Sequence, residues 1–239
     1  MSTDISLGNI EESLRYADEL KGQGNVHFKA GNWEDALASY RVALGTLPKR
    51  KPIPKPKQDL PEDEPLSQVG SSSKDKVDLD VKEEEVPVVL TEEEVKAAKA
   101  RAVLNANIGA CYLKLSEHKE VVNACSEALL DDPHYIKALQ RRASSNEQLN
   151  TWSSLTSAQE DYNTLLDLLP ESSNEKKEIQ RTLQRLKPRV EAAQQQETTE
   201  MLDKLKGIGN NILGNFGLST DNFKFVPNGQ GGYSMNFNR

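Results

Sequence analysis

The sequence predicts an all-α protein, a solenoid of three helix-turn-helix repeats with capping helices after the third. Three observations predict this fold class. A pattern of small and aromatic residues recurs three times with a period of roughly 34 residues. A long segment between the first two copies is rich in proline, serine and charge, without apolar periodicity, which predicts a disordered insertion. After the cap, the composition changes to glycine, asparagine and alternating aromatics, which predicts a short non-helical tail.

The repeats are recognised by small residues that let two helices approach closely, with larger residues filling the gaps between them. Gly109, the counterpart of Gly24, comes about fifty residues later than an adjacent repeat would place it. The third copy carries about three extra residues around 151–155, which predicts an irregular turn between its helices. The pattern positions are Gly24, Phe28, Gly31, Trp33, Ala36, Tyr40, Ala43 and Pro48 in the first copy, Gly109, Tyr112, Ala128 and Pro133 in the second, and Ala143, Ala158, Tyr162 and Pro170 in the third.

Capping signatures and prolines set the boundaries of the predicted segments. Thr91, with Glu94 three residues later, has the capping-box pattern that starts a helix, and Ser172 with Glu175 repeats it. Pro188 is expected to break the helix that follows. The predicted segments are a flexible N-terminus (1–12), repeat one (13–48), the acidic and proline-rich insertion (49–90), repeat two with an extended first helix (91–135), repeat three (136–171), capping helices (172–206) and a tail that forms a hairpin or a partner-binding segment (207–239).

Composition and charge argue against several classes of function. The formal charge of −7 argues against nucleic-acid binding, which rests on accumulated Lys and Arg. The acidic start of the chain and the absence of any long apolar run predict no targeting segment and no membrane insertion. Cys111 and Cys125 have no second pair for a disulfide framework or a metal site, and the three histidines (His27, His118 and His134) fall on separate helical segments. We therefore expect a cytoplasmic monomer, with a nuclear location left open, that is not an enzyme and uses no cofactor.

Five polar residues fall on the helices that are expected to line the concave groove of the solenoid. Lys21 and Asn25 are four residues apart, so they share one face of the first helix, and Lys137 and Arg141 have the same spacing in the third repeat. Asn107 lies on the first helix of the second repeat. One such residue alone is more often a solvated lysine or arginine, or an asparagine in a local hydrogen bond. The five positions together favour a shared anionic ligand.

At these positions the sequence resembles the two-carboxylate-clamp tetratricopeptide-repeat domains of co-chaperones. The resemblance implies that the groove binds the Glu-Glu-Val-Asp C-terminus of heat-shock protein 90, heat-shock protein 70 or both. It implies that Lys21, Asn25 and Asn107 hold the terminal carboxylate. It also implies that Lys137 and Arg141 hold the aspartate side chain and nearby peptide oxygens. An alternative from another class is a scaffold whose groove binds a non-chaperone peptide, for example in GTPase signalling.

The tail concentrates aromatic residues beyond the repeats. Aromatic residues alternate with polar ones on both sides of a Pro-Asn-Gly sequence, which predicts two strands joined by a turn. Two roles are open at this point. The tail either contacts an unknown client protein or folds back onto the last helices and completes the cap. The residues of this candidate second site are Phe216, Leu218, Phe223, Phe225, Tyr233 and Phe237.

Overall fold

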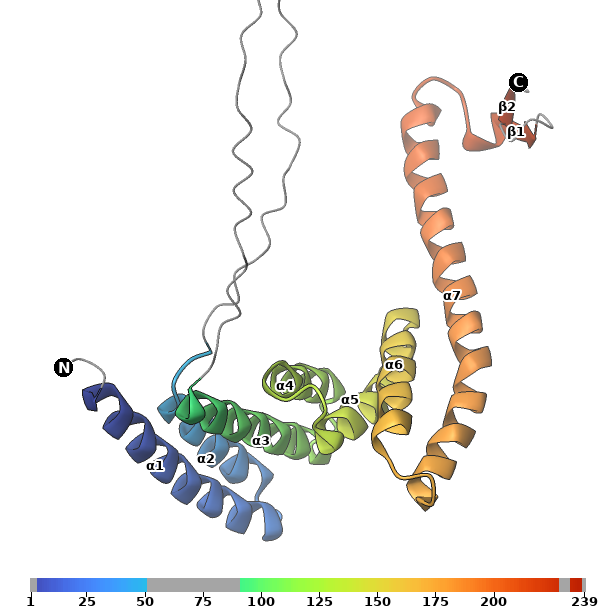
Figure 1. Cartoon of the computed structure of the whole chain (residues 1–239). Helices are drawn as coiled ribbons and strands as arrows, with labels where there is room; N and C mark the ends of the chain where they lie inside the picture. The colour runs from blue at the N-terminus through green and yellow to red at the C-terminus, as the bar shows by residue number, and fades with distance from the viewer. Residues whose placement is uncertain (1–3, 51–90, 228–232, 238–239) are drawn as a thin grey trace, which may run out of the picture.

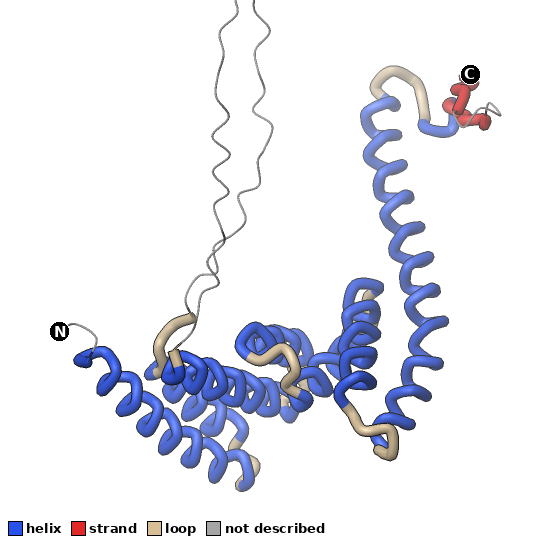
Figure 2. Tube along the Cα trace, in the orientation of Figure 1, coloured by secondary structure: helices blue, strands red, loops and turns tan. Residues whose placement is uncertain are grey.

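The computed structural model describes residues 4–50, 91–227 and 233–237, and most of the predicted insertion (49–90) lies outside them. Figure 1 shows the order of the elements along the chain, and Figure 2 their secondary structure. The elements are α1 (Asp4–Lys29), α2 (Trp33–Thr46), α3 (Glu92–Lys114), α4 (His118–Asp131), α5 (Ile136–Leu149), α6 (Trp152–Leu168), α7 (Asn174–Gly214), the 3-10 turn η1 (Thr220–Asn222), β1 (Phe223–Pro227) and β2 (Tyr233–Phe237).

The first six helices form three antiparallel pairs that stack in chain order. Helix α2 packs against α3, and α4 packs against α5, so each pair buries its apolar face on the next (Figure 1). The first helices also contact one another, α1 with α3 and α3 with α5, and they line one face of the stack. The predicted all-α solenoid is confirmed.

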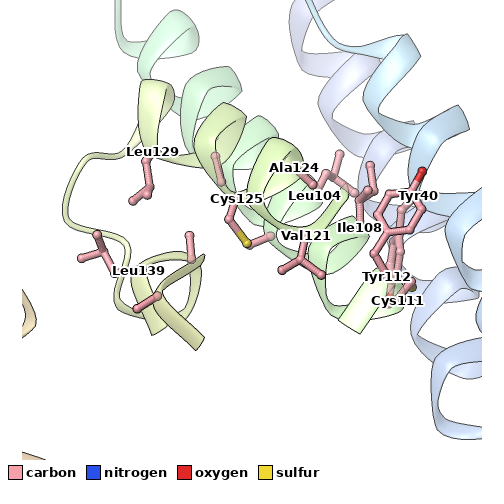
Figure 3. Close-up of a cluster of buried hydrophobic side chains, with 14 of the residues drawn as sticks. Tyr40, Leu104, Ile108, Cys111, Tyr112, Val121, Ala124, Cys125, Leu129 and Leu139 are labelled. Atoms are coloured by element: carbon pink, nitrogen blue, oxygen red, sulfur yellow. The ribbon is translucent and has the colours of Figure 1, made fainter. Parts of the chain in front are cut away.

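Small residues bring the two helices of each pair close together. A Cβ atom on Gly24 would lie 2.6 Å from Cε1 of Tyr40, and one on Gly109 would lie 2.8 Å from Sγ of Cys125. Figure 3 shows the cluster in which Tyr40, Cys111 and neighbouring side chains fill the spaces between helices. Burial raises the pKa of both Cys111 and Cys125 to about 11, so the two thiols stay protonated at neutral pH. They are core residues of the second repeat.

The turn between the two helices of the third repeat is compact, so the expected irregular turn is wrong. Asn150 adopts the left-handed conformation (φ 53°) and ends α5. Thr151 then starts α6 with a capping box, in which its hydroxyl accepts a hydrogen bond from the backbone NH of Ser154 at 3.1 Å. The extra residues lengthen α6 to 17 residues, against 14 in α2 and in α4. They leave the far wall of the groove regular.

Helix α7 runs without interruption through Pro188, where the sequence predicted a break and several capping helices. Pro188 cannot donate to the carbonyl of Gln184, but both residues are exposed, so that carbonyl is open to water. On the opposite side, Ile179 and Leu186 are buried in the core. Their burial holds the helix together across the proline.

Three segment boundaries also differ from the prediction. The cap of α7 is Ser173, whose hydroxyl accepts from the backbone NH of Glu175 at 3.1 Å, and not Ser172. The helix continues to Gly214, so residues 207–214 of the expected non-helical tail are helical. Residues 4–12 of the expected flexible N-terminus belong to α1. The predicted capping box of Thr91 and Glu94 is confirmed at the start of α3.

A buried ion-pair cluster lies where repeat one ends and the insertion begins. The Asp131 side chain is 2% exposed and receives Arg50 Nη2 at 2.8 Å and Arg101 Nη2 at 2.7 Å. Arg101 Nη1 also donates to the carbonyl of Pro48 at 2.8 Å. Burial alone would raise the pKa of Asp131, but the hydrogen bonds and charges of the two arginines hold that pKa below its ordinary value. The cluster joins the end of repeat one to both helices of repeat two.

The tail forms the predicted two-stranded hairpin. Strands β1 and β2 pair in an antiparallel arrangement that sets Phe223 opposite Phe237. The ring centroids of these two phenylalanines are 5.4 Å apart. The predicted turn at residues 228–229 lies outside the described residues. The hairpin is attached to the far end of α7, where the Thr220 backbone NH donates to Asn210 Oδ1 at 2.6 Å. The hairpin therefore sits away from the repeat stack (Figure 1).

Candidate peptide-binding groove

Arg141 brings the third repeat against the second. It stands on α5, and its Nη1 donates to the carbonyl of Ala106 on α3 at 2.7 Å. Ala106 directly precedes Asn107 on α3, so this bond ties Arg141 to the backbone one residue before Asn107. Arg141 has no carboxylate partner within the described part of the chain. Its remaining donors are therefore available to a ligand.

Asn25 is oriented by a tyrosine from the second helix of its own repeat. The Tyr40 hydroxyl donates to Asn25 Oδ1 at 2.7 Å, which leaves the Asn25 NH2 group as the free donor. Burial and the neighbouring Cys111 raise the pKa of Tyr40 to about 12, against the opposing charge of Arg141. The hydroxyl therefore remains a donor at neutral pH.

Lys21 lies beside a pocket between α1 and α3. The pocket has a volume of about 380 Å³, and Lys21 forms an ion pair with Asp18 at its edge. Lys96 and Lys99 of α3 also line it, and sequence reasoning missed both. The sequence pattern that could have identified them is their three-residue spacing, which places both on one face of the long first helix of repeat two. The remaining lining residues are Leu14, Ala17, Ala100, Val103 and Leu104.

Lys137 stands one turn before Arg141 on α5. Its side chain is exposed and has no ion pair or hydrogen bond with any described residue. Arg141 and Arg142 are adjacent on α5 but differ in their partners. Arg142 donates to both oxygens of Asp161, at 2.9 and 2.6 Å, and the Asp161 side chain is 3% exposed. Arg142 is therefore structural. The positive charges left open on this face are those of Lys137 and Arg141.

The first helices of the three repeats carry amide, ammonium and guanidinium donors, which are groups that can hydrogen-bond to an ionised carboxylate. Within residues 4–50, 91–227 and 233–237 no cluster of His, Cys, Asp and Glu could hold a metal ion. No described helix combines the length and apolar character needed to cross a bilayer.

The candidate second site lies far from this groove. Phe216 is 75% exposed at the end of α7, and Phe237 is exposed on β2. Leu218 and Phe223 are half-buried near the junction of α7 and the hairpin. The side chains of Phe225 and Tyr233 lie outside the described residues. The structure therefore places the candidate groove residues on α1, α3 and α5, and the tail residues beyond the end of α7.

Comparison with known proteins gives relatives that match part of this chain. No protein-family model matches the sequence. FK506-binding protein 59 of Drosophila melanogaster is 28% identical over 160 residues, which cover 67% of this chain and 27% of that protein. Human mitochondrial import receptor subunit TOM70 is 27% identical over 138 residues, 58% of this chain and 15% of the receptor. The chain thus spans a minor part of each relative's length.

Solved structures decide the fold type. The C-terminal TPR-containing domain of a Plasmodium falciparum protein named as an FK506-binding protein aligns with a TM-score of 0.50 at 18% identity, covering 78% of this chain and 95% of that domain. This chain has a tetratricopeptide-repeat (TPR) fold. The first TPR of Spaghetti (RPAP3), solved with the HSP90 peptide SRMEEVD, aligns with a TM-score of 0.44 at 19% identity, covering 73% of this chain and 94% of that one. In the TPR nomenclature, α1, α3 and α5 are the first helices of the three repeats.

Proposed function

We propose that the TPR groove binds the free C-terminus of an acidic peptide, the Glu-Glu-Val-Asp end of heat-shock protein 90 or 70, and that the protein is a non-enzymatic adaptor. One observation carries the proposal. Arg141 of α5 donates to the Ala106 carbonyl on α3, one residue before Asn107, and Tyr40 holds Asn25 of α1 with its NH2 group free. Cationic and amide donors thus stand on the first helices of all three repeats, where α1 contacts α3 and α3 contacts α5. Such a set favours a ligand with two carboxylates close together.

The five side chains form two groups, one for each of the two carboxylates of a terminal aspartate. We propose that Lys21 and the amides of Asn25 and Asn107 hold the main-chain carboxylate. Tyr40 supports this role, because its bond to Asn25 Oδ1 leaves the NH2 group to donate. Lys137 and Arg141 hold the aspartate side chain. Lys21 is already paired with Asp18, so its ammonium is shared with the ligand, while Lys137 is free of described acidic partners.

Titration with a peptide and its amide tests the proposal. The heptapeptide SRMEEVD, used with the RPAP3 domain, is expected to bind with a micromolar Kd, because a short flexible ligand loses contact energy to ordering. Amidation of its C-terminus removes the charge that the donors require, and should weaken binding about 30-fold or more. Isothermal calorimetry on the full chain measures both. Equal affinity for the acid and the amide would favour the alternative, a scaffold that binds an internal non-chaperone peptide.

For the tail we propose contact with a client or second factor. Phe216, which follows α7, and Met235 and Phe237 on β2 are each exposed, and the hairpin lies away from the repeat stack (Figure 1). The segments LKGIGNNILGNFGLSTDNF and GGYSMNF resemble the end of tetratricopeptide repeat protein 1, a eukaryotic cytosolic adaptor. On this resemblance we propose an adaptor of that type, located in the cytoplasm.

Deleting residues 215–239 tests the role of the tail. Its described attachment to α7 is through Thr220, so the deletion should change the melting temperature by only about 1 °C or less, and leave the Kd for SRMEEVD unchanged. It should remove a subset of partners captured from lysate and counted by mass spectrometry. Arg141→Ala in the full chain is the matched control, because it should lose the chaperones and keep that subset. A fall of several degrees without loss of any partner would show that the tail is structural.

A further inference from the structure

The second half of α7 exposes the face that its first half buries. In the first half, Ile179 and Leu186 are buried, and Val190 packs against the same core. At residue 197 the helix passes the start of α6, where the backbone NH of Trp152 donates to Glu197 Oε1 at 2.6 Å. Beyond this point α7 projects alone for several turns (Figure 1). The apolar face nevertheless continues.

Four large apolar residues form this uncovered stripe: Met201, Leu205, Ile208 and Ile212, each between 55% and 60% exposed. Their spacings of four, three and four residues place them on one side of the helix, as in the seam of a coiled coil. A contiguous exposed row of this kind is unusual on a monomer and indicates an interface. The sequence predicted that residues 172–206, with Met201 and Leu205, cap the repeat stack, but α7 extends past the first residue of α6, so α6 does not cover the stripe.

The tail does not cover the stripe. Among the described residues, Thr220 contacts Gly209 and Asn210, and the Leu218 backbone NH donates to the carbonyl of Leu213. Gly209, Asn210 and Leu213 lie about 70°, 170° and 110° round the helix from the middle of the stripe. The hairpin therefore lies beside the stripe and leaves the stripe uncovered.

We infer that the stripe pairs with the same stripe of a second copy of the chain, in an antiparallel two-helix contact. The spacing is symmetric, so a two-fold axis between residues 206 and 207 sets Met201 opposite Ile212 of the second copy and Leu205 opposite Ile208. Every seam residue then meets an apolar partner. Helix α6 already packs antiparallel on this face, so the helix of the second copy continues the line that α6 begins.

The surroundings of the seam suit this pairing. Lys204 on one flank comes to lie near Asn211 of the second copy, so no like charges oppose each other there. Phe216 of the second copy falls opposite Glu197, next to Trp152, which is 40% exposed. The contact buries on the order of 1,000 Å² in total, at the lower end for specific interfaces, which predicts a reversible dimer with a micromolar Kd. This inference is independent of the groove and goes beyond the proposed function.

Sedimentation equilibrium of the full chain from about 1 to 200 μM tests the association. The weight-average mass should rise from monomer towards dimer for the wild type. Ile208→Glu should abolish the rise, since it places two carboxylates in the seam, while the fold and the Kd for SRMEEVD stay unchanged. The matched control is Thr199→Glu, which adds the same charge on the opposite face and should dimerise normally. A wild type that is monomeric throughout, or equal loss in both variants, would overturn the inference.

Disulfide trapping tests the orientation. Met201→Cys and Ile212→Cys are made separately and oxidised alone or as an equimolar mixture. The antiparallel register predicts a disulfide-linked dimer in the mixture, and little from either variant alone, because the two copies of residue 201 lie about 16 Å apart along the helix. The native Cys111 and Cys125 are fully buried and do not compete. Ready linkage of Met201→Cys to itself would show a parallel pair and overturn the proposed arrangement.

Discussion

Replacing Asp131 with alanine is expected to lower the free energy of unfolding by about 3–5 kcal/mol, because it leaves Arg101 buried without its carboxylate partner. The Arg101 side chain is 13% exposed, and Arg50 loses its principal partner in the same change. Urea denaturation at pH 7 measures the effect. The control is Asp132→Ala, which removes a carboxylate that accepts only an exposed backbone hydrogen bond from His134 and should cost about 1 kcal/mol or less.

The destabilisation should depend on pH in a defined direction. The folded-state pKa of Asp131 is held below its ordinary value, so the contribution of the carboxylate is complete above the unfolded pKa of about 3.9. It is lost as the pH falls through the folded pKa. The gap between the wild type and Asp131→Ala should therefore be constant from about pH 7 to 5 and shrink below about pH 4. A gap that stays constant down to pH 2 would show that Asp131 acts through packing and not through its charge.

The repeat fold could be predicted because its signals are local. Gly24 and Gly109 mark positions where only a hydrogen atom fits beneath a side chain of the paired helix, and this requirement recurs along the sequence. The capping box of Thr91 and Glu94 likewise lies within four residues. The five candidate groove residues follow from the same repeat register. Their placement on α1, α3 and α5 therefore needed no tertiary information.

The remainder depends on contacts between distant segments. Arg50 and Asp131 are separated by 81 positions, and nothing in the sequence pairs them. The continuity of α7 through Pro188 arises from the burial of Leu186 in the core, which outweighs a local cost of about 3 kcal/mol. The pocket lined by Lys96 and Lys99 exists only because the long α3 lies beside α1. In each case tertiary packing decides what a local rule could not.

The two adjacent arginines of α5 should separate binding from stability. Arg141→Ala is expected to weaken binding of SRMEEVD by about 30-fold or more, equivalent to about 2 kcal/mol, because it removes a charged partner of a ligand carboxylate. Its described hydrogen bond is to the Ala106 carbonyl, at a half-buried site, so the free energy of unfolding should fall by only about 1 kcal/mol. Calorimetry and urea denaturation on the same preparation measure the two effects.

Arg142→Ala should give the opposite result. It leaves the Asp161 carboxylate, which is 3% exposed and accepts two hydrogen bonds from Arg142, buried without a partner. The free energy of unfolding should therefore fall by about 3–5 kcal/mol. Under conditions where the variant stays folded, its Kd for the peptide should match that of the wild type, because Arg142 faces Ser126 and Asp161 and not the groove. The double substitution Arg142→Met with Asp161→Leu removes both charges and should recover part of the stability. If Arg142→Ala weakens binding as much as Arg141→Ala does, the ligand does not contact the inner face of α5, and the assignment of Arg141 to the groove is wrong.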